Sequence, residues 1–200
     1  MHARVLTFRD ANDIEAGVSF LREKVIPLLG DQNGYRGMTA SADRAGGVLG
    51  VLTLWETAED RAASFGALAD VRQEADGLVG GKLETETFEE MVVETGSEPP
   101  EPGAFLMITR VSMDPAAVDE NAAYFKAEVA PRIKERAGFR GLRSMMNRET
   151  GKGITGTVWS DEEALKAAAE DARASRERGA ARDVNFGEVS FREILLIELP

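Results

Sequence analysis

Two stretches of the chain carry their apolar residues on a single helical stripe. In the first stretch these residues are spaced four, three, four and four apart: Ile14, Val18, Leu21, Val25 and Leu29. The second stretch repeats the pattern with Val118, Ala122, Phe125, Val129 and Ile133. Such spacing places all five side chains on one face of an α-helix. Each stretch has a proline near its end, Pro27 or Pro131, which removes a backbone donor and predicts a kink or a separate last turn.

The segments around these helices are short, β-rich and bounded by turn residues, which predicts strands. In the first half of the chain the predicted strands are residues 4–9, 35–43, 48–56 and 82–94. In the second half they are residues 104–111, 139–147, 154–160 and 188–199. An alanine-rich helix is predicted between the last two strands of each half, at 58–75 and 161–178. Each half therefore has the order β-α-β-β-α-β, the ferredoxin-like plan of a four-stranded antiparallel sheet with two helices on one face.

The two halves read as copies of one design. At a fixed offset of 104 residues, the stretch from Val25 to Ala63 matches its counterpart at 11 of 39 positions without a gap. Composition alone predicts about two or three matches. The tetrapeptide GYRG at 34–37 meets GFRG at 138–141, and the two tryptophans of the chain, Trp55 and Trp159, meet each other. The last strands align at an offset of 103, so one residue is missing before them in the second half.

This duplication predicts three parts: a first ferredoxin-like repeat at 1–95, a linker at 96–103 and a second repeat at 104–200. The sequence TGSEPPEPG at 95–103 has three prolines and cannot continue a strand, so we expect a short, stiff linker there. A single sheet of this kind leaves one face bare, and a second copy can cover it as in a homodimer. The predicted fold class is α+β, with two tandem ferredoxin-like repeats forming an intrachain pseudo-dimeric α+β barrel.

Nearly the whole chain resembles the dimeric α+β barrel superfamily, in particular antibiotic-biosynthesis-monooxygenase-like domains. The resemblance rests on the helix that ends before G-Y/F-R-G and on the tryptophan that closes the third strand of each half. An acidic, alanine-rich helix follows that tryptophan in both halves, in LTLWETAEDRAA and GTVWSDEEALKAA. The superfamily includes cofactor-free monooxygenases, haem-degrading enzymes, lactone isomerases and members with no known activity. The resemblance implies a binding cavity between the helices and the sheet of each half.

The chain departs from this family at two places. Haem-degrading relatives carry a histidine on the second helix, where this chain has Ser64-Phe65-Gly66 in one half and Ala168-Ala169-Glu170 in the other. Many relatives also have an acidic residue two positions before the tryptophan, where this chain has Thr53 or Thr157. We therefore do not expect haem degradation.

Composition excludes further classes of function. The formal charge is −11, which disfavours nucleic acid and acidic membrane surfaces as partners. There is no cysteine and the only histidine is His2, so we expect neither a cofactor nor a metal. No run approaches the roughly 20 apolar residues of a membrane-spanning helix, and the N-terminus lacks the apolar stretch of a signal peptide. We expect a cytoplasmic protein that is a monomer, as the pseudo-dimer, or a further homodimer.

The aromatic candidates for a ligand site are Trp55, Trp159 and Tyr35. Each tryptophan follows a predicted strand and could form an aromatic wall for a flat ligand, although packing in the core is the commoner role of tryptophan. Tyr35 corresponds to Phe139 in the second half, so the shared fold does not require its hydroxyl. That makes Tyr35 a candidate in the first half, with a plain core position as the alternative.

The charged candidates are Arg36 and Arg140, one residue after the aromatic residue of the second strand of each half. An arginine in an apolar cleft can bind a carboxylate or an enolate, because its guanidinium is planar and always charged. The alternative is a structural ion pair. Arg173, Arg176, Arg178 and Arg182 form a local basic cluster that also fits a solvated helix face. Met145 and Met146 either line a soft apolar cavity in the second half or fill its core.

Two functions of equal weight remain. The first is cofactor-independent, monooxygenase-like oxidation of a small aromatic or polyketide-type compound. In it the protein supplies a dry cavity and a cation that stabilises developing negative charge. The second is a non-catalytic module of the same fold that binds a small apolar or aromatic ligand or acts as a scaffold. A cavity of roughly 300 Å³ or more beside Trp55 or Trp159, with an arginine pointing in, would favour binding or catalysis over a scaffold.

Overall fold

A computed structural model describes residues 1–180 and 182–198, and the side chains of residues 173–175 and 177–179 lie outside that description. The chain forms two compact units. Unit 1 consists of Met1–Thr87 and Glu193–Pro200, and unit 2 consists of Phe88–Arg192. The last strand of the first repeat, β4, therefore begins in unit 1 and ends in unit 2. The last strand of the second repeat, β8, begins in unit 2 and ends in unit 1.

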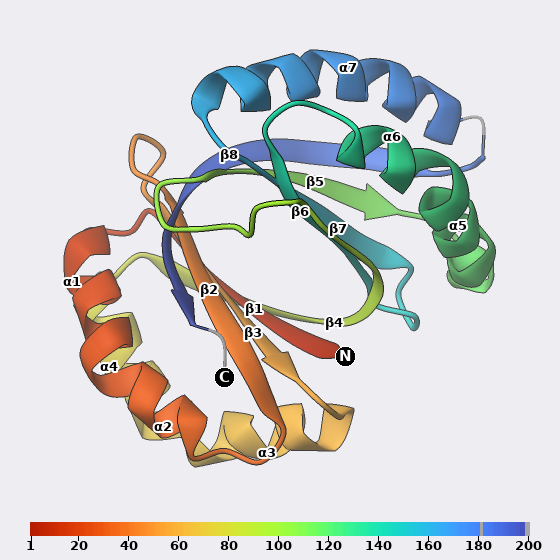
Figure 1. Ribbon diagram of the computed structural model, residues 1–200. Coiled ribbons are helices and arrows are strands. Elements are labelled where there is room, and N and C mark those ends of the chain that lie inside the picture. The colour runs from red at the N-terminus through yellow and green to blue at the C-terminus, as the bar shows by residue number, and fades with distance from the viewer. Residues whose placement is uncertain (181, 199–200) are drawn as a thin grey trace. The chain divides into compact units, whose positions relative to one another are not determined.

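Unit 1 is built from three of its own complete strands and four helices. Its elements are β1 (His2–Arg9), α1 (Ile14–Phe20), α2 (Ile26–Gly30), β2 (Tyr35–Asp43), β3 (Val48–Trp55), α3 (Ala58–Ala67), α4 (Ala69–Val79) and the first part of β4 (Lys82–Thr95). β3 lies between β1 and β2 and is antiparallel to both. The end of β8 (Asn185–Glu198) pairs with β2, from Ala42 opposite Glu193 to Met38 opposite Glu198. The helices of unit 1 cover one face of this sheet (Figure 1).

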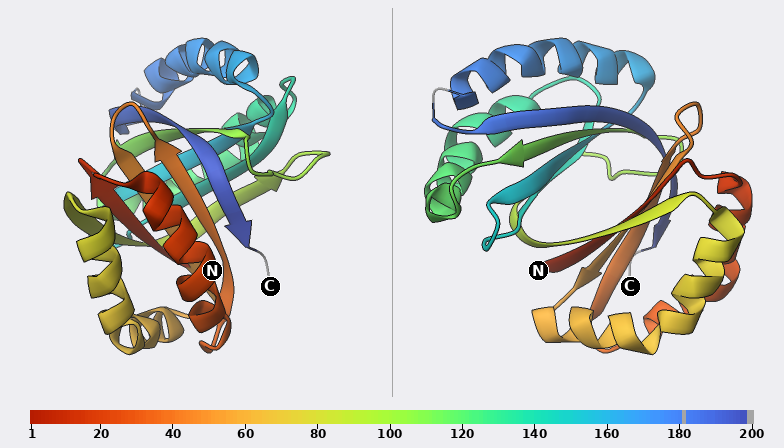
Figure 2. Two further views of the ribbon diagram at one scale, coloured as in Figure 1. Left: turned by 90° about the vertical axis from the view of Figure 1, so that its left-hand side faces the viewer. Right: turned by 180° about the vertical axis from the view of Figure 1, so that it is seen from behind.

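Unit 2 repeats the plan. Its elements are β5 (Phe105–Ser112), α5 (Val118–Tyr124), α6 (Ala130–Lys134), β6 (Phe139–Met146), β7 (Lys152–Trp159), α7 (Glu162–Ala180) and the first part of β8. β7 lies between β5 and β6, antiparallel to both, and the end of β4 pairs with β6. The two views of Figure 2 show α5, α6 and α7 on one face of this sheet. Both halves thus have the predicted order β-α-β-β-α-β.

Within unit 1 the strands are hydrogen-bonded in the order β4-β1-β3-β2-β8, and within unit 2 in the order β8-β5-β7-β6-β4. Because β4 and β8 are each 14 residues long, each is long enough to pair within both units. The predicted fold class, α+β with two tandem ferredoxin-like repeats, is confirmed.

Both first helices contain a π-helical turn, at Leu21–Val25 and Phe125–Val129. Pro27 and Pro131 follow directly, in the first turns of α2 and α6. A proline has no N–H for the helical ladder, and a wider turn before it accommodates the missing donor. The prediction of a separate last turn after each proline is confirmed in both repeats.

The second helix differs between the repeats. Residues 58–75 were expected to form one helix, but α3 ends at Ala67 and α4 starts at Ala69. Leu68 between them has φ −105° and ψ 23°. Gly66 lies in the last turn of α3 and weakens it, whereas Glu170 at the same place allows α7 to run unbroken.

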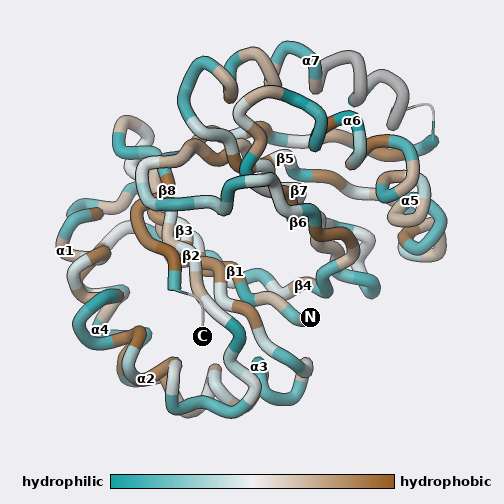
Figure 3. Tube along the Cα trace, in the orientation of Figure 1, coloured by the Kyte–Doolittle hydropathy of each residue, from teal (hydrophilic) through white to brown (hydrophobic). Residues whose placement is uncertain are grey.

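Along the Cα trace, hydrophobic residues are concentrated in the strands, and the helices alternate between hydrophobic and hydrophilic residues (Figure 3). In unit 1 a cluster around Trp55 includes Leu21, Leu29, Met38 and Val51. In unit 2 the matching cluster around Trp159 includes Met107, Leu142, Leu165 and Ala168. Each unit therefore has its own core between its helices and its sheet.

Candidate functional site

The two tryptophans that were candidates for an aromatic wall are core residues of their units. Trp55 and Trp159 are 0% and 1% exposed. Each indole Nε1 donates to the hydroxyl of the threonine two positions earlier, over 3.0 Å to Thr53 and 2.9 Å to Thr157. The threonine that replaces the family's acidic residue therefore satisfies a buried indole N–H. Core packing accounts for both tryptophans.

The candidate arginines are held in ion pairs. Arg36 pairs with Glu56 near the surface of unit 1. Arg140 pairs with Glu98, which lies in the segment between β4 and β5. Neither is brought next to its tryptophan by a hydrogen bond or a ring contact among the described residues. Their geometry matches the structural alternative given to them above.

Tyr35 has the same ring packing as Phe139, its counterpart in unit 2, and differs from it by a buried hydroxyl. Its ring packs edge-on against Trp55, with 5.6 Å between the ring centroids, as that of Phe139 does against Trp159 at 5.8 Å. The Tyr35 hydroxyl is buried and has no hydrogen-bond partner among the described residues. Burial, and secondarily the charge of Glu198, raises the pKa of Tyr35 above its ordinary value. The phenol is therefore held neutral in an apolar setting.

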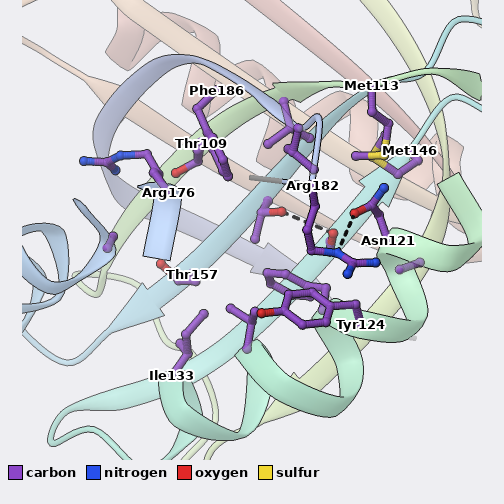
Figure 4. A pocket seen from close by; sticks show the side chains of 18 of the residues that line it. Thr109, Met113, Asn121, Tyr124, Ile133, Met146, Thr157, Arg176, Arg182 and Phe186 are labelled. Carbon is purple, nitrogen blue, oxygen red and sulfur yellow. Dashed lines mark hydrogen bonds between the residues drawn. The ribbon is translucent and has the colours of Figure 1, made fainter. Parts of the chain in front are cut away.

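Unit 2 contains a cavity of about 140 Å³ between its helices and its sheet (Figure 4). Its walls are mainly apolar and come from Met107, Val111, Met113, Val118, Ala122, Phe125, Val129, Ile133, Met146, Ala172, Val184 and Phe186. Polar side chains also line it: Thr109, Asn121, Tyr124, Ser144, Thr155, Thr157, Arg176 and Arg182. A dry protein cavity of about 150 Å³ holds a benzene ring. The space therefore suits a ligand with one ring, and it is smaller than the roughly 300 Å³ set above as the mark of a binding site.

A second, more open depression of about 450 Å³ lies beside Trp159. Its lining includes Arg136, Ser160, Asp161 and the alanine face of α7. Arg136 is paired with Asp171 there. This depression therefore meets the size and the position beside Trp159 that were set above as the mark of a binding site, but its arginine is paired and most of its remaining side chains are small.

Hydroxyl groups line the sheet side of the cavity in one row. Thr109 of β5 lies opposite Thr155 of β7, and Thr155 lies opposite Ser144 of β6. The Oγ1 atom of Thr155 donates to Oγ of Ser144 over 3.2 Å. The same row in unit 1, fixed by the same strand register, is Leu6, Val51 and Ala40. Because unit 1 folds with an apolar row there, the three hydroxyls of unit 2 are not needed for the fold.

The space itself also arises from differences between the repeats. In unit 1 a Cβ on Gly17 would lie 2.8 Å from Val79 and 2.9 Å from Leu49, so these two side chains fill the gap beneath α1. Gly153 is the counterpart of Leu49 in unit 2, because each is the second residue of its strand, β7 or β3. The Met146 side chain, which lines the cavity, takes up part of the place that this leucine leaves.

Arg182 occupies the place of Val79. The offset of 103 in this segment is supported by the next residue, since Gly80 and Asp183 both have a positive φ, 70° and 59°. The helix position of Gly17 becomes Asn121. A buried valine packed on a glycine in unit 1 is therefore an arginine beside an asparagine in unit 2.

Arg182, Asn121 and Tyr124 form a polar group at one side of the cavity (Figure 4). Nε of Arg182 donates to Oδ1 of Asn121 over 3.3 Å, and Nη2 donates to Glu120 over 2.7 Å. The guanidinium lies over the Tyr124 ring, 4.3 Å from its centroid, which is a cation–π contact. The Asn121 amide nitrogen donates to the carbonyl of Ala117, so its orientation is fixed. This group places a cation and an amide beside an otherwise apolar space.

The described lining of the cavity holds neither a carboxylate nor a histidine. A group that removes a proton from a bound molecule at neutral pH is therefore missing from it. The arrangement can bind a flat apolar body, exchange hydrogen bonds with its oxygen atoms and favour negative charge on one edge. Of the two methionines singled out in the sequence, Met146 lines this cavity, whereas Met145 is a buried core residue.

The basic cluster of the sequence is only partly described. Arg176 and Arg182 line the cavity, and the side chains of Arg173 and Arg178 lie outside the described residues. Arg182 lies beyond the end of α7 and contacts Asn121 and Tyr124, so it does not belong to a solvated helix face.

Structure comparison finds proteins with the same fold, and sequence comparison finds uncharacterized relatives. No protein-family model matches it. An uncharacterized protein of Mycobacterium tuberculosis, Rv2557, is 26% identical over 167 residues, covering 83% of this chain and 74% of that protein. The crystal structure of a candidate monooxygenase of Fusobacterium nucleatum matches with a TM-score of 0.72 at 14% identity, over 99% of this chain and 94% of the other. An anthrone oxidase-like protein matches with a TM-score of 0.71 at 15% identity, over 98% and 92%.

The chain has the dimeric α+β barrel fold. Both copies of the ferredoxin-like unit lie in one polypeptide, as the sequence predicts. At these identities the likeness shows the fold and leaves the activity open.

Within residues 1–180 and 182–198, none of the helices combines the length and apolar character needed to span a bilayer. The same part of the chain contains no group of three or more histidine, aspartate or glutamate side chains placed to hold a metal ion.

Proposed function

We propose that unit 2 binds a small, flat, largely apolar molecule that carries oxygen substituents, of the phenol or polyketide type. The observation that supports this proposal is the row of hydroxyls on the sheet side of a one-ring cavity, at positions that are apolar in the other repeat. A hydroxyl both donates and accepts, so it can pair with a phenol or a carbonyl. The apolar helix side would cover the face of the ring.

Calorimetric titration of the full chain with resorcinol and with toluene tests this proposal. Both are single rings, but only resorcinol can pair with the hydroxyl row. We expect resorcinol to bind more tightly. Replacing Ser144 by alanine and Thr155 by valine, the residues that unit 1 has at these positions, should weaken its binding about tenfold, since each hydrogen bond contributes about 0.5–1.5 kcal/mol. The matched control is Ala40→Ser in unit 1, which should leave the affinity unchanged. Equal affinity for the two rings, or an unaffected double variant, would refute the proposal.

Oxidation of such a ligand by O₂ is the second candidate function. It is favoured by the position of Arg182 at the cavity. Nη2 of Arg182 is paired with Glu120 and its Nε with Asn121, so Nη1 is the donor that would stabilise an enolate or phenolate. The names of the structural neighbours, a candidate monooxygenase and an anthrone oxidase-like protein, support the same reaction. In this reaction an acidic CH₂ group, next to an aromatic ring or a carbonyl, becomes C=O. One oxygen atom of O₂ enters the product, and the other leaves as water with the two hydrogens.

Oxygen uptake separates the two candidates. With 1,3-cyclohexanedione, a single-ring substrate that ionises at neutral pH without help from a protein base, and with no added cofactor, the oxidase proposal predicts one O₂ consumed per ketone formed, at a rate that falls at least tenfold in Arg182→Val. Val79 already occupies the matching position of unit 1, so the substituted residue suits this fold. Uptake no faster than in buffer would reject oxidation and leave ligand binding as the function.

A further inference from the structure

Unit 1 contains a group of arginines that unit 2 lacks. Arg4 of β1, Arg61 of α3 and Arg72 of α4 converge around Ser64 and Phe65 of α3. Arg4 is 6% exposed, which is unusual for a charged side chain. The strand register places Arg4 opposite Thr53, just as it places Met107 opposite Thr157 in unit 2.

The guanidinium of Arg4 is bound only by neutral groups. Its Nη1 donates to Oγ of Ser64 over 3.2 Å, and its Nη2 donates to the carbonyl of Arg61. It also lies 5.7 Å from the Trp55 ring centroid and 4.8 Å from that of Phe65. No carboxylate within the described part of the chain forms an ion pair with it.

Arg72 lies against the same aromatic ring. Its guanidinium is 3.5 Å from the Phe65 ring centroid, and its Nη1 donates to the Phe65 carbonyl over 2.8 Å. Like Arg4, it has no carboxylate partner among the described residues. A guanidinium has five N–H groups. The hydrogen bonds named here use two of those on Arg4 and one on Arg72, so both groups retain donors for a further acceptor.

The charges of the group also oppose one another. Burial, and after it the positive charges of Arg61 and Arg72, lowers the pKa of Arg4 to about 10. Burial lowers the pKa of Arg61 and of Arg72 as well. Gathering like charges in a partly buried place is unfavourable unless a counter-charge is present.

The fold does not require this arrangement. Unit 2 has Met107, Leu165, Ala168 and Ala169 where unit 1 has Arg4, Arg61, Ser64 and Phe65. The first three are buried apolar residues of the unit 2 core. A protein that can fill this place with apolar side chains, yet gathers arginines there in one repeat, has a use for the positive charge.

We propose that Arg4 and Arg72, with Phe65 beside them, form a binding site in unit 1 for a small oxyanion, a phosphate or a carboxylate. The planar guanidinium fork matches the two oxygens of such a group. Phe65 is 37% exposed, so the site reaches the surface at this ring. The site is separate from the unit 2 cavity and does not depend on the function proposed for it.

Thermal unfolding of the full chain at constant pH and ionic strength tests this proposal. Inorganic phosphate, acetate and chloride are compared at equal ionic strength. We expect phosphate or acetate to raise the Tm with increasing concentration, as a ligand of the folded state does, and chloride to have no such effect. The more effective of the two oxyanions identifies the ligand class. Equal responses to all three salts would show charge screening only and would overturn the site.

Two variants and one control locate the effect. Arg4→Met introduces the residue of unit 2, and Arg72→Gln removes a charge at a half-buried position. Each should weaken oxyanion binding at least tenfold, and Arg4→Met should raise the Tm in the absence of oxyanion. Arg36→Gln removes one paired positive charge from the same unit and should retain wild-type binding. If Arg4→Met does not fold, the oxyanion-dependent rise of the Tm in Arg72→Gln alone tests the site. A full oxyanion response in folded Arg72→Gln, or its loss in Arg36→Gln, would refute the site.

Discussion

Replacing Tyr35 by phenylalanine removes one buried oxygen atom and no hydrogen bond. The Tyr35 hydroxyl has no partner among the described residues, and the ring is 7% exposed. An unsatisfied buried polar group costs about 1–3 kcal/mol. The ring keeps its edge-on contact with Trp55, since Phe139 makes the same contact with Trp159 in the other repeat. We therefore expect Tyr35→Phe to raise the free energy of unfolding by about 1 kcal/mol, or the Tm by about 2–4 °C for a chain of this size.

The effect of this substitution should grow at high pH. Burial raises the pKa of Tyr35 in the folded state, whereas the unfolded phenol ionises near pH 10. The stability contributed by the neutral phenol is therefore complete below pH 10 and is lost as the pH rises above it. At pH 11 the wild type should lose about 1.4 kcal/mol that Tyr35→Phe keeps. The difference between the two proteins would then be about 2.4 kcal/mol, against about 1 kcal/mol at pH 8.

Urea unfolding of both proteins at pH 8 and pH 11, followed by circular dichroism, measures these differences. Phe139→Tyr is the matched control. It adds a hydroxyl at the equivalent buried position and should destabilise unit 2 by about 1–3 kcal/mol. The reasoning fails if Tyr35→Phe is less stable than the wild type at pH 8, or if the difference is the same at both pH values.

Three further predictions follow from the core, the helix caps and the composition. Thr157→Val leaves the buried Trp159 N–H without its acceptor and should lower the free energy of unfolding by about 1–3 kcal/mol in urea titrations; an unchanged midpoint would contradict the role given to this threonine. Asp161 accepts a hydrogen bond from the backbone N–H of Ala164 at the start of α7, and this bond lowers the pKa of the Asp161 carboxyl. The stability that it contributes is present above the unfolded pKa and is lost as the pH falls. Asp161→Ala should therefore lose less free energy of unfolding between pH 6 and pH 3 than the wild type does, as measured by urea unfolding at both pH values. Haem added to the protein should give no shift of its Soret band, because neither second helix carries a histidine, and a saturable shift would overturn that expectation.

The architecture could be predicted from the sequence because its signals are local and occur twice. The strand predicted at 35–43 is β2, Tyr35–Asp43, and both prolines start separate last turns as expected. The break between α3 and α4 was missed. A single glycine, Gly66, weakens a helix that an alanine-rich pattern otherwise supports, and the pattern alone does not show which effect is larger.

The site was harder to predict because residue type alone says little about partners. Arg36 and Arg140 stand out as charges next to aromatic residues, but their glutamates lie about 20 and 42 positions away in the chain. The better signal is the difference between the repeats. Gly153 against Leu49 and Thr155 against Val51 are visible in the alignment of the two halves. Arg182 was noted as part of a basic cluster, but the one-residue shift obscured its match to Val79. The place of Arg4 depends on a strand register that the sequence does not show.

The methionine methyl groups give the most direct test of a ligand site in unit 2. Met107, Met113 and Met146 line the cavity, and Met38 is a buried core residue of unit 1. In a protein labelled with ¹³C at its methionine methyls, added resorcinol should shift the three cavity signals with one common affinity and leave that of Met38 in place. Cavity signals that stay fixed at saturating resorcinol, or a Met38 signal that moves as far as theirs, would contradict the account.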